Sequence, residues 1–130
     1  MVSVPIISMS LDENTLSELD SLPAKLGFAG RSEAIRAGVK QLIAENKGVD
    51  SLSGRVKSVL LMVHDESDEE KATTVKHKFE DIISTQVHSN LKSGKCLEIF
   101  VLNGAASRVK ELFREAQANR KVEYLKLVVP

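Results

Sequence analysis

The first half of the chain shows one short alternating stretch followed by two amphipathic ones. Residues 4–10 alternate loosely between apolar and small polar side chains, which predicts a β-strand. Because Pro5 cannot take part in a central ladder, we expect an edge strand or a two-stranded ribbon. Asp12 and Ser32 are good N-caps for two helices, and Gly27 ends the first. The apolar positions recur at helical spacing, at Leu16, Leu19 and Leu22 and then at Ile35, Val39, Leu42 and Ile43.

One strand and two short helices, about 45 residues in all, cannot bury a core alone. The economical solution is an intertwined dimer in which the strands of two copies pair. The segments 11–22, 27–28 and 31–36 resemble the ribbon-helix-helix repressors, whose strand pair enters the DNA major groove. The resemblance implies that residues 1–46 form such a DNA-binding domain. The DNA-contacting residues that it implies are Ile6, Ser8, Ser10, Arg31 and Ser32, the last holding a phosphate with neighbouring helix amides.

The charge of this domain leaves a second interpretation open. Residues 1–50 carry five basic and seven acidic side chains, and the outward face of the strand has no Arg, Lys, Asn or Gln. Those side chains are the usual readers of base edges, and phosphate contacts supply much of the affinity for DNA. A pure dimerisation module is therefore the alternative to a DNA-binding domain, although hydroxyls and helix N-termini can also contact DNA.

The second half of the chain predicts a mixed α+β domain. Residues 47–54 are polar, with two glycines, and predict a flexible linker. The predicted elements of domain 55–130 are strand 55–64, a helix to about Ile83, strands 84–91 and 96–102, a helix after Asn103-Gly104, and strand 121–129. The near-continuous apolar run of the first strand suggests burial on both faces. The order βαββαβ is that of a ferredoxin-like split unit of the ACT-like type, a layout used for small sensing and oligomerising modules.

Composition narrows the function classes. The formal net charge is zero, and the single cysteine rules out an internal disulfide framework. The sequence shows neither a signal peptide nor a membrane span, so we expect a cytoplasmic protein with no membrane partner. An enzyme is not expected, because no nucleophile with an adjacent base and no phosphate-cradling loop is visible.

Two of the three histidines and the only cysteine fall between His77 and Cys96. Imidazole and thiolate together suit a borderline or soft transition metal. His88 and Asn90 project from one face of their strand, and a loop at 91–95 would pair Asn90 with Cys96 on that face. His77 lies about 200° around its helix from Val75, away from the apolar stripe. The pattern therefore favours a metal site that is shared between subunits.

At this spacing the chain resembles the NikR family of nickel-responsive repressors over essentially its whole length. His77 matches the helix histidine of that family, His88 the first strand histidine, and Cys96-Leu97-Glu98 the cysteine motif. The resemblance implies a homotetramer, with two ribbon-helix-helix dimers at the ends of a central sensing core. It also implies a square-planar nickel site that is completed by His77 from a neighbouring subunit.

One ligand position departs from the family pattern. Asn90 stands where the family has the second strand histidine, and an amide oxygen is a poorer nickel ligand than an imidazole. The donor set therefore suits copper or zinc at least as well as nickel, and cobalt is a further candidate. His64, at the end of its strand, is interpreted as a surface residue or as an auxiliary ligand.

The leading hypothesis is a metal-responsive transcriptional repressor that binds a palindromic double-stranded DNA operator. Metal would bridge subunits of the sensing core and bias the orientation of the two DNA-binding dimers. One alternative is a regulator of the same architecture that has lost metal and responds to a small organic ligand. Another is a metal-binding oligomer that does not bind DNA, which the acidic first domain would suit.

Overall fold

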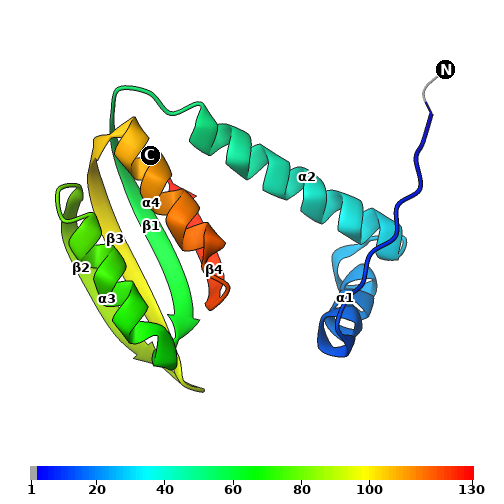
Figure 1. The fold of residues 1–130 in the computed structure, drawn as a ribbon. Helices are drawn as coiled ribbons and strands as arrows, with labels where there is room; N and C mark the ends of the chain where they lie inside the picture. Colours follow the sequence, from blue (N-terminus) through cyan, green and yellow to red (C-terminus); the bar gives the residue numbers. More distant parts are fainter. Residues whose placement is uncertain (1–2) are drawn as a thin grey trace. The chain divides into compact units, whose positions relative to one another are not determined.

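A computed structural model describes residues 3–130 of the chain (Figure 1). Its backbone contacts divide the chain into two compact units, which meet between Asn46 and Lys47. The long helix α2, Arg31–Asp50, crosses this boundary, so its last turn belongs to the second unit. No helix among the described residues is long and apolar enough to cross a membrane.

The first unit contains α1, Glu13–Leu26, and most of α2. The predicted cap of α1 is confirmed, because Asp12 accepts a hydrogen bond from the Thr15 amide. The predicted end is confirmed too, because Gly27 has a left-handed φ of 76°. Residues 3–12 form neither helix nor strand in this single chain, and the pairing of two such segments in a dimer stays a prediction.

Two predictions about α2 were wrong. Ser32 is not its N-cap, because the helix begins one residue earlier, and the Glu33 carboxylate instead accepts the amide N–H of Ala29 at 2.6 Å. The flexible linker predicted at 47–54 is helical as far as Asp50, which leaves residues 51–54 between α2 and the next strand. The physical reason is burial: Val49 packs into the core of the second unit, and that contact holds the last helical turn in place.

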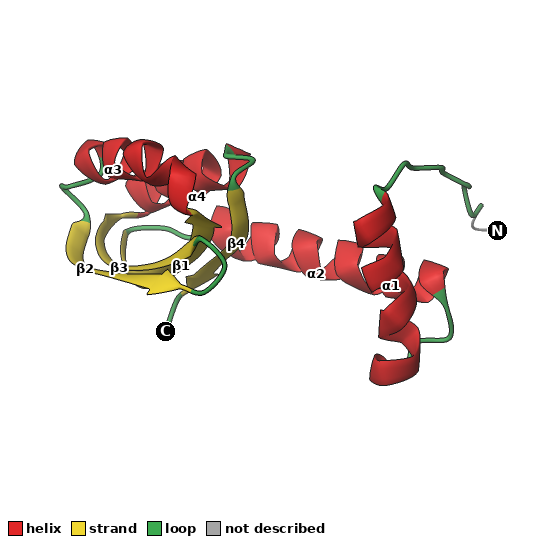
Figure 2. Ribbon diagram, turned by 90° about the horizontal axis from the view of Figure 1, so that it is seen from below, coloured by secondary structure: helices red, strands yellow, loops and turns green. Residues whose placement is uncertain are grey.

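The second unit is an antiparallel four-stranded sheet with two helices on one face (Figure 2). The strand order is β2-β3-β1-β4, which is the ferredoxin-like arrangement, and the predicted order of helices and strands is confirmed. Its elements are β1 Arg55–Asp65, the short 3-10 helix η1 Glu66–Asp68, α3 Glu69–Lys78, β2 Ile83–Leu91, β3 Lys95–Ala105, α4 Ala106–Ala118 and β4 Val122–Val128.

The core lies between the sheet and the two helices. Leu60, Phe100 and Leu102 fill the helix-covered face of the sheet, and the predicted stripe of α4 packs against them with Val109, Leu112, Phe113 and Ala116. Helix α3 ends at Lys78, five residues earlier than predicted, because Phe79 and Ile82 turn into the core.

The opposite face of the sheet stays apolar and largely open in this chain. Its side chains come from all four strands and include Leu61, Val87, Val101, Tyr124 and Val128. The last four of these are between 39% and 51% exposed. The prediction that β1 is buried on both faces is met only in part, because its inward residues are buried while Val59, Leu61 and Val63 on this face are half-buried.

Candidate metal-binding site

Three neighbouring strands bring polar side chains together at one end of the helix-covered face. His64 of β1 pairs with Cys96 of β3, and Cys96 pairs with Asn90 of β2, so the three form one row across the sheet. The predicted pairing of Asn90 with Cys96 is confirmed. In the next row, Glu98 of β3 lies beside His88 of β2. Because directly opposed residues project from the same face, all five side chains face the layer of helices.

Cys96 is a buried free thiol. Its Sγ lies 3.5 Å from Asn90 Oδ1, to which the thiol donates. Burial raises the pKa of the Cys96 thiol above its usual value, and the carboxylates of Glu66, Glu69, Glu98 and Asp65 raise it further. The thiol therefore keeps its proton at neutral pH, and a bound cation would have to displace that proton.

His64 is not the surface residue that its strand-end position suggested. It is fully buried, with Nδ1 2.8 Å from the Asp65 carbonyl oxygen and Nε2 3.2 Å from Glu98 Oε2. The signal that corrects the interpretation is strand parity, because Leu60, Met62 and His64 alternate onto one face. The parity of β1 thus continues to the end of the strand and carries an imidazole next to Cys96.

Glu98 is the residue that sequence analysis missed as a part of the site. Its side chain is only 1% exposed, and one carboxylate oxygen contacts groups from two different elements. Glu98 Oε1 lies 3.1 Å from Lys76 Nζ on α3, 3.2 Å from Gln86 Nε2 and 3.8 Å from His88 Nδ1. The available signal was the alternation of Cys96, Glu98 and Phe100, which places a carboxylate in the middle of a buried strand face.

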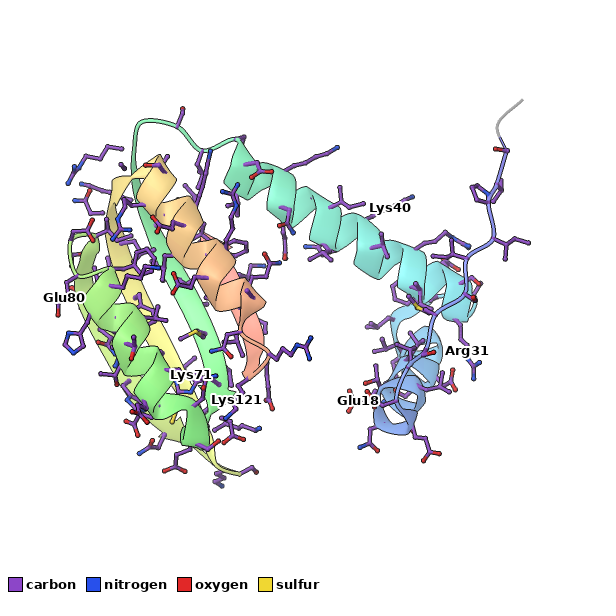
Figure 3. All side chains as sticks on the ribbon, viewed as in Figure 1. Glu18, Arg31, Lys40, Lys71, Glu80 and Lys121 are labelled. Carbon is purple, nitrogen blue, oxygen red and sulfur yellow. The ribbon has the colours of Figure 1, made fainter. Side chains whose placement is uncertain are left out.

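His88 and His77 lie in different surroundings. The His88 side chain is 28% exposed, and its Nδ1 lies 3.8 Å from Glu98 Oε1 and 3.9 Å from Glu69 Oε1. The His77 side chain is 71% exposed near the end of α3, where its Nδ1 lies 2.7 Å from Glu80 Oε1. Figure 3 shows Glu80 directed away from the sheet. The outward direction predicted for His77 is confirmed, and this chain does not bring His77 to the other donors.

The donor set fits a soft or borderline metal in kind, but it is incomplete in one chain. Cys96 supplies a sulfur, His88 an imidazole and Asn90 an amide oxygen, on adjacent strands. Across residues 3–130, no group of three or more His, Cys, Asp and Glu side chains is arranged to hold a metal ion. A complete coordination sphere therefore needs a donor from outside this chain or a rearrangement within it.

The residues predicted to contact DNA lie in the first unit. Ile6 is 95% exposed, and Ser8, Ser10 and Ser32 are exposed as well. Arg31 forms a two-pronged ion pair with Asp20, at 2.6 and 2.8 Å, which lowers the pKa of that carboxyl. Its guanidinium is thus already engaged in this single chain.

Part of the chain has a distant likeness among solved structures. The uncharacterized protein TM1266 from Thermotoga maritima superposes with a TM-score of 0.54 at 15% sequence identity. The match covers 58% of this chain and 98% of that one. This likeness shows the shared fold alone.

Sequence relatives define the class more narrowly. Residues 58–129, which lie within the second unit, match the family described as the NikR C terminal nickel binding domain. The chain is 35% identical to a protein of Methanococcus vannielii and 37% identical to one of Methanocaldococcus jannaschii, both named "Putative nickel-responsive regulator". Each match covers 99% of this chain and 94% of the relative. The chain belongs to the NikR family.

Proposed function

We propose that the protein is a metal-responsive, DNA-binding transcriptional repressor. The observation that carries this proposal is the row of Cys96 and Asn90 beside His88, under the helices of a domain whose family is described as nickel-binding. The carboxylates of Glu66, Glu69, Glu98 and Asp65 act on this buried thiol, and such surroundings favour a cation.

We assign the metal to Cys96 and His88 of one subunit and to His77 of a neighbouring subunit. The exposure of His77 supports this assignment, because a side chain that points away from its own core can reach another chain. Asn90 is a weak fourth donor, and His64 is an auxiliary one on the far side of Cys96. A bound metal would supply a positive charge that stabilises the thiolate and joins two subunits.

Uncovered apolar surface in both units supports the proposed oligomeric state. The open face of the sheet offers Leu61, Val87 and Val101 to a second copy, which would bury both faces of β1. In the first unit, Ile6 and Met9 are exposed and would be covered if two ribbon-helix-helix segments intertwine. These two surfaces together support a homotetramer, and we propose that the protein acts in the cytoplasm.

DNA recognition belongs to the first unit in this proposal. Paired strands at residues 4–10 would present Ile6, Ser8 and Ser10 to the bases, and the start of α2 with Arg31 and Ser32 would face phosphates. Two-fold symmetry of the dimer predicts a palindromic operator. Metal binding would change the affinity for this operator through a coupling free energy of about 1–3 kcal/mol.

Metal titration is the test of the sensing site. We expect one of nickel, cobalt, copper or zinc to bind tightly, and a coloured ion to show a thiolate charge-transfer band. Cys96→Ala should abolish that band, and Asn90→His should tighten nickel binding, since it restores an imidazole at the fourth position. Absence of tight binding by all four metals would contradict the proposal and favour a regulator that senses an organic ligand.

A second experiment tests the DNA-binding part separately. Selection from a random pool of duplexes, with and without the bound metal, should recover a palindromic site. Ser8→Ala combined with Ser10→Ala should weaken that binding, while Ser84→Ala, a serine of the second unit, should not. If no duplex is enriched in either condition, the excess of acidic side chains in the first unit favours the alternative, a metal-binding oligomer.

A further inference from the structure

We propose that Lys76 is a built-in cation that weakens binding of divalent metals at this site by neutralising Glu98. The inference rests on the proposed metal site and names a means by which its affinity is set. Lys76 acts on the metal through the charge of Glu98, and it is not itself a ligand.

The geometry places the lysine and the carboxylate in direct contact. Lys76 Nζ lies 3.1 Å from Glu98 Oε1, with the Glu98 side chain 1% exposed and that of Lys76 22% exposed. A carboxylate taken out of water is costly unless a charge or several hydrogen bonds compensate it. Lys76 reaches from α3 to supply that charge.

The other partners of Glu98 do not carry a permanent charge. Gln86 donates from a neutral amide at 3.2 Å, and the two histidines that approach Glu98 are cationic only when protonated. Among the residues that the structure describes, Lys76 is therefore the one permanent cation in contact with this carboxylate.

The position of Glu98 makes its charge matter to a metal. It pairs with His88 across β2 and β3, and it lies two residues from Cys96 on the same strand face. A carboxylate at that place attracts a cation bound by Cys96 and His88, and an ammonium in contact with the carboxylate cancels most of that attraction. The attraction that Lys76 cancels grows with the charge of the ion, so Lys76 lowers the affinity for a divalent ion more than for a monovalent one.

Replacing Lys76 should therefore tighten metal binding, which is the opposite of what loss of a merely structural contact would do. For Lys76→Met we expect the affinity for nickel and zinc to rise on the order of tenfold. Lys76→Arg keeps the charge and should keep the wild-type affinity. The matched control is Lys71→Met, an exposed lysine on the same helix, which should leave the affinity unchanged.

The measurement is competition between the full-length protein and a chelator of known affinity, with the metal salts alone as probes. A second readout is the thermal midpoint of the metal-free protein, which should fall for Lys76→Met because Glu98 loses its counter-charge. Affinity that is unchanged or weaker in Lys76→Met, while wild type binds metal, would overturn this inference and leave the proposed function intact. If neither wild type nor any variant binds a metal, the proposed function fails first.

Discussion

The two units of the chain bury their apolar side chains in different ways. In the second unit, residues from both helices and from the sheet close around Phe79, Phe100 and Leu102. In the first unit, Ala34 is buried, whereas the large side chains that the helical pattern singled out, among them Leu42 and Ile43, are about half exposed. The same rule of periodicity predicted both sets, but one has found its partners inside the chain and the other has not.

The difference teaches that an apolar stripe indicates a surface to be covered and does not say by what. A unit of about 45 residues has too little interior to cover its own stripes, and the second unit has a sheet on which both helices can pack. We therefore expect the second unit to be stable alone. The first unit should depend on a second copy for its stability.

The largest effect is expected in the core of the second unit. Phe100→Ala removes a buried ring beneath the helices, and we expect a loss of about 3–5 kcal/mol in the free energy of unfolding. Denaturant unfolding monitored by circular dichroism measures this loss. The loss should not depend on protein concentration if this unit is stable alone. A loss below about 1 kcal/mol would show that the Phe100 ring does not lie in a packed core.

A somewhat smaller effect is expected from pH at the polar end of the same unit. Because the pKa of Cys96 is raised above 9.0, metal binding must release the thiol proton, and affinity should increase as pH rises. With one proton released, the affinity should change about tenfold per pH unit, or a hundredfold from about pH 6.5 to 8.5. Competition with a chelator at several pH values measures the slope.

The stability of the metal-free protein should change with pH in the opposite direction to its metal affinity. The folded protein holds the thiol proton more tightly than the unfolded chain, so the metal-free protein should lose stability as pH rises through the raised pKa. Cys96→Ser, with a neutral side chain throughout this range, is the control that should lack this loss. A metal affinity that stays constant with pH would show that the thiol is not a ligand.

Sequence reasoning worked where one local rule decides the outcome. Strand parity and the length of the turn were enough to pair Asn90 with Cys96, and helical phase was enough to turn His77 outward. It failed where a tertiary contact overrides local signals: the glycine-containing end of α2 is helical because Val49 is buried.

The polar cluster was only half predictable for a related reason. Histidine and cysteine are rare enough to be noticed, whereas a glutamate in a strand is usually a solvated residue, so Glu98 was named as part of the Cys96-Leu97-Glu98 motif but not as part of the site. Its burial depends on Lys76, which comes from another element and sits at no fixed sequence spacing from it. His64 was misplaced because a strand end was taken for a surface, although the alternation of Leu60, Met62 and His64 places the ring on the buried face, where it contacts Glu98.

A more modest effect should distinguish the first unit from the second. Ile43 is 49% exposed in one chain, so Ile43→Ala would cost little if that exposure persisted. If a second copy covers α2, we expect a loss of roughly 1–2 kcal/mol that appears as a concentration-dependent thermal midpoint. Lys40→Ala, on the same exposed helix, is the control (Figure 3). An effect of Ile43→Ala no larger than that of the control would contradict the dimer.

The smallest effect is expected from a pair of aspartates, one in each unit. The pKa of Asp65 is lowered to about 2, chiefly because its carboxylate accepts the Ser67 amide and also contacts Lys95. Its stabilising contribution is therefore fully present above the unfolded value of 3.8 and is lost as pH falls through about 2. Asp65→Asn should lower the thermal midpoint slightly at neutral pH, and the difference from wild type should vanish in strong acid.

Asp20 offers the counterpart in the first unit, because Arg31 lowers the pKa of its carboxyl in the same direction. The side chains of Asp20 and Asp65 are 42% and 44% exposed, so solvent screening keeps both effects small. If the two units unfold separately, calorimetry should show Asp20→Asn shifting one transition and Asp65→Asn shifting the other. If both substitutions shift a single common transition, the two units unfold together. The difference in how they bury their apolar side chains would then not make them separate unfolding units.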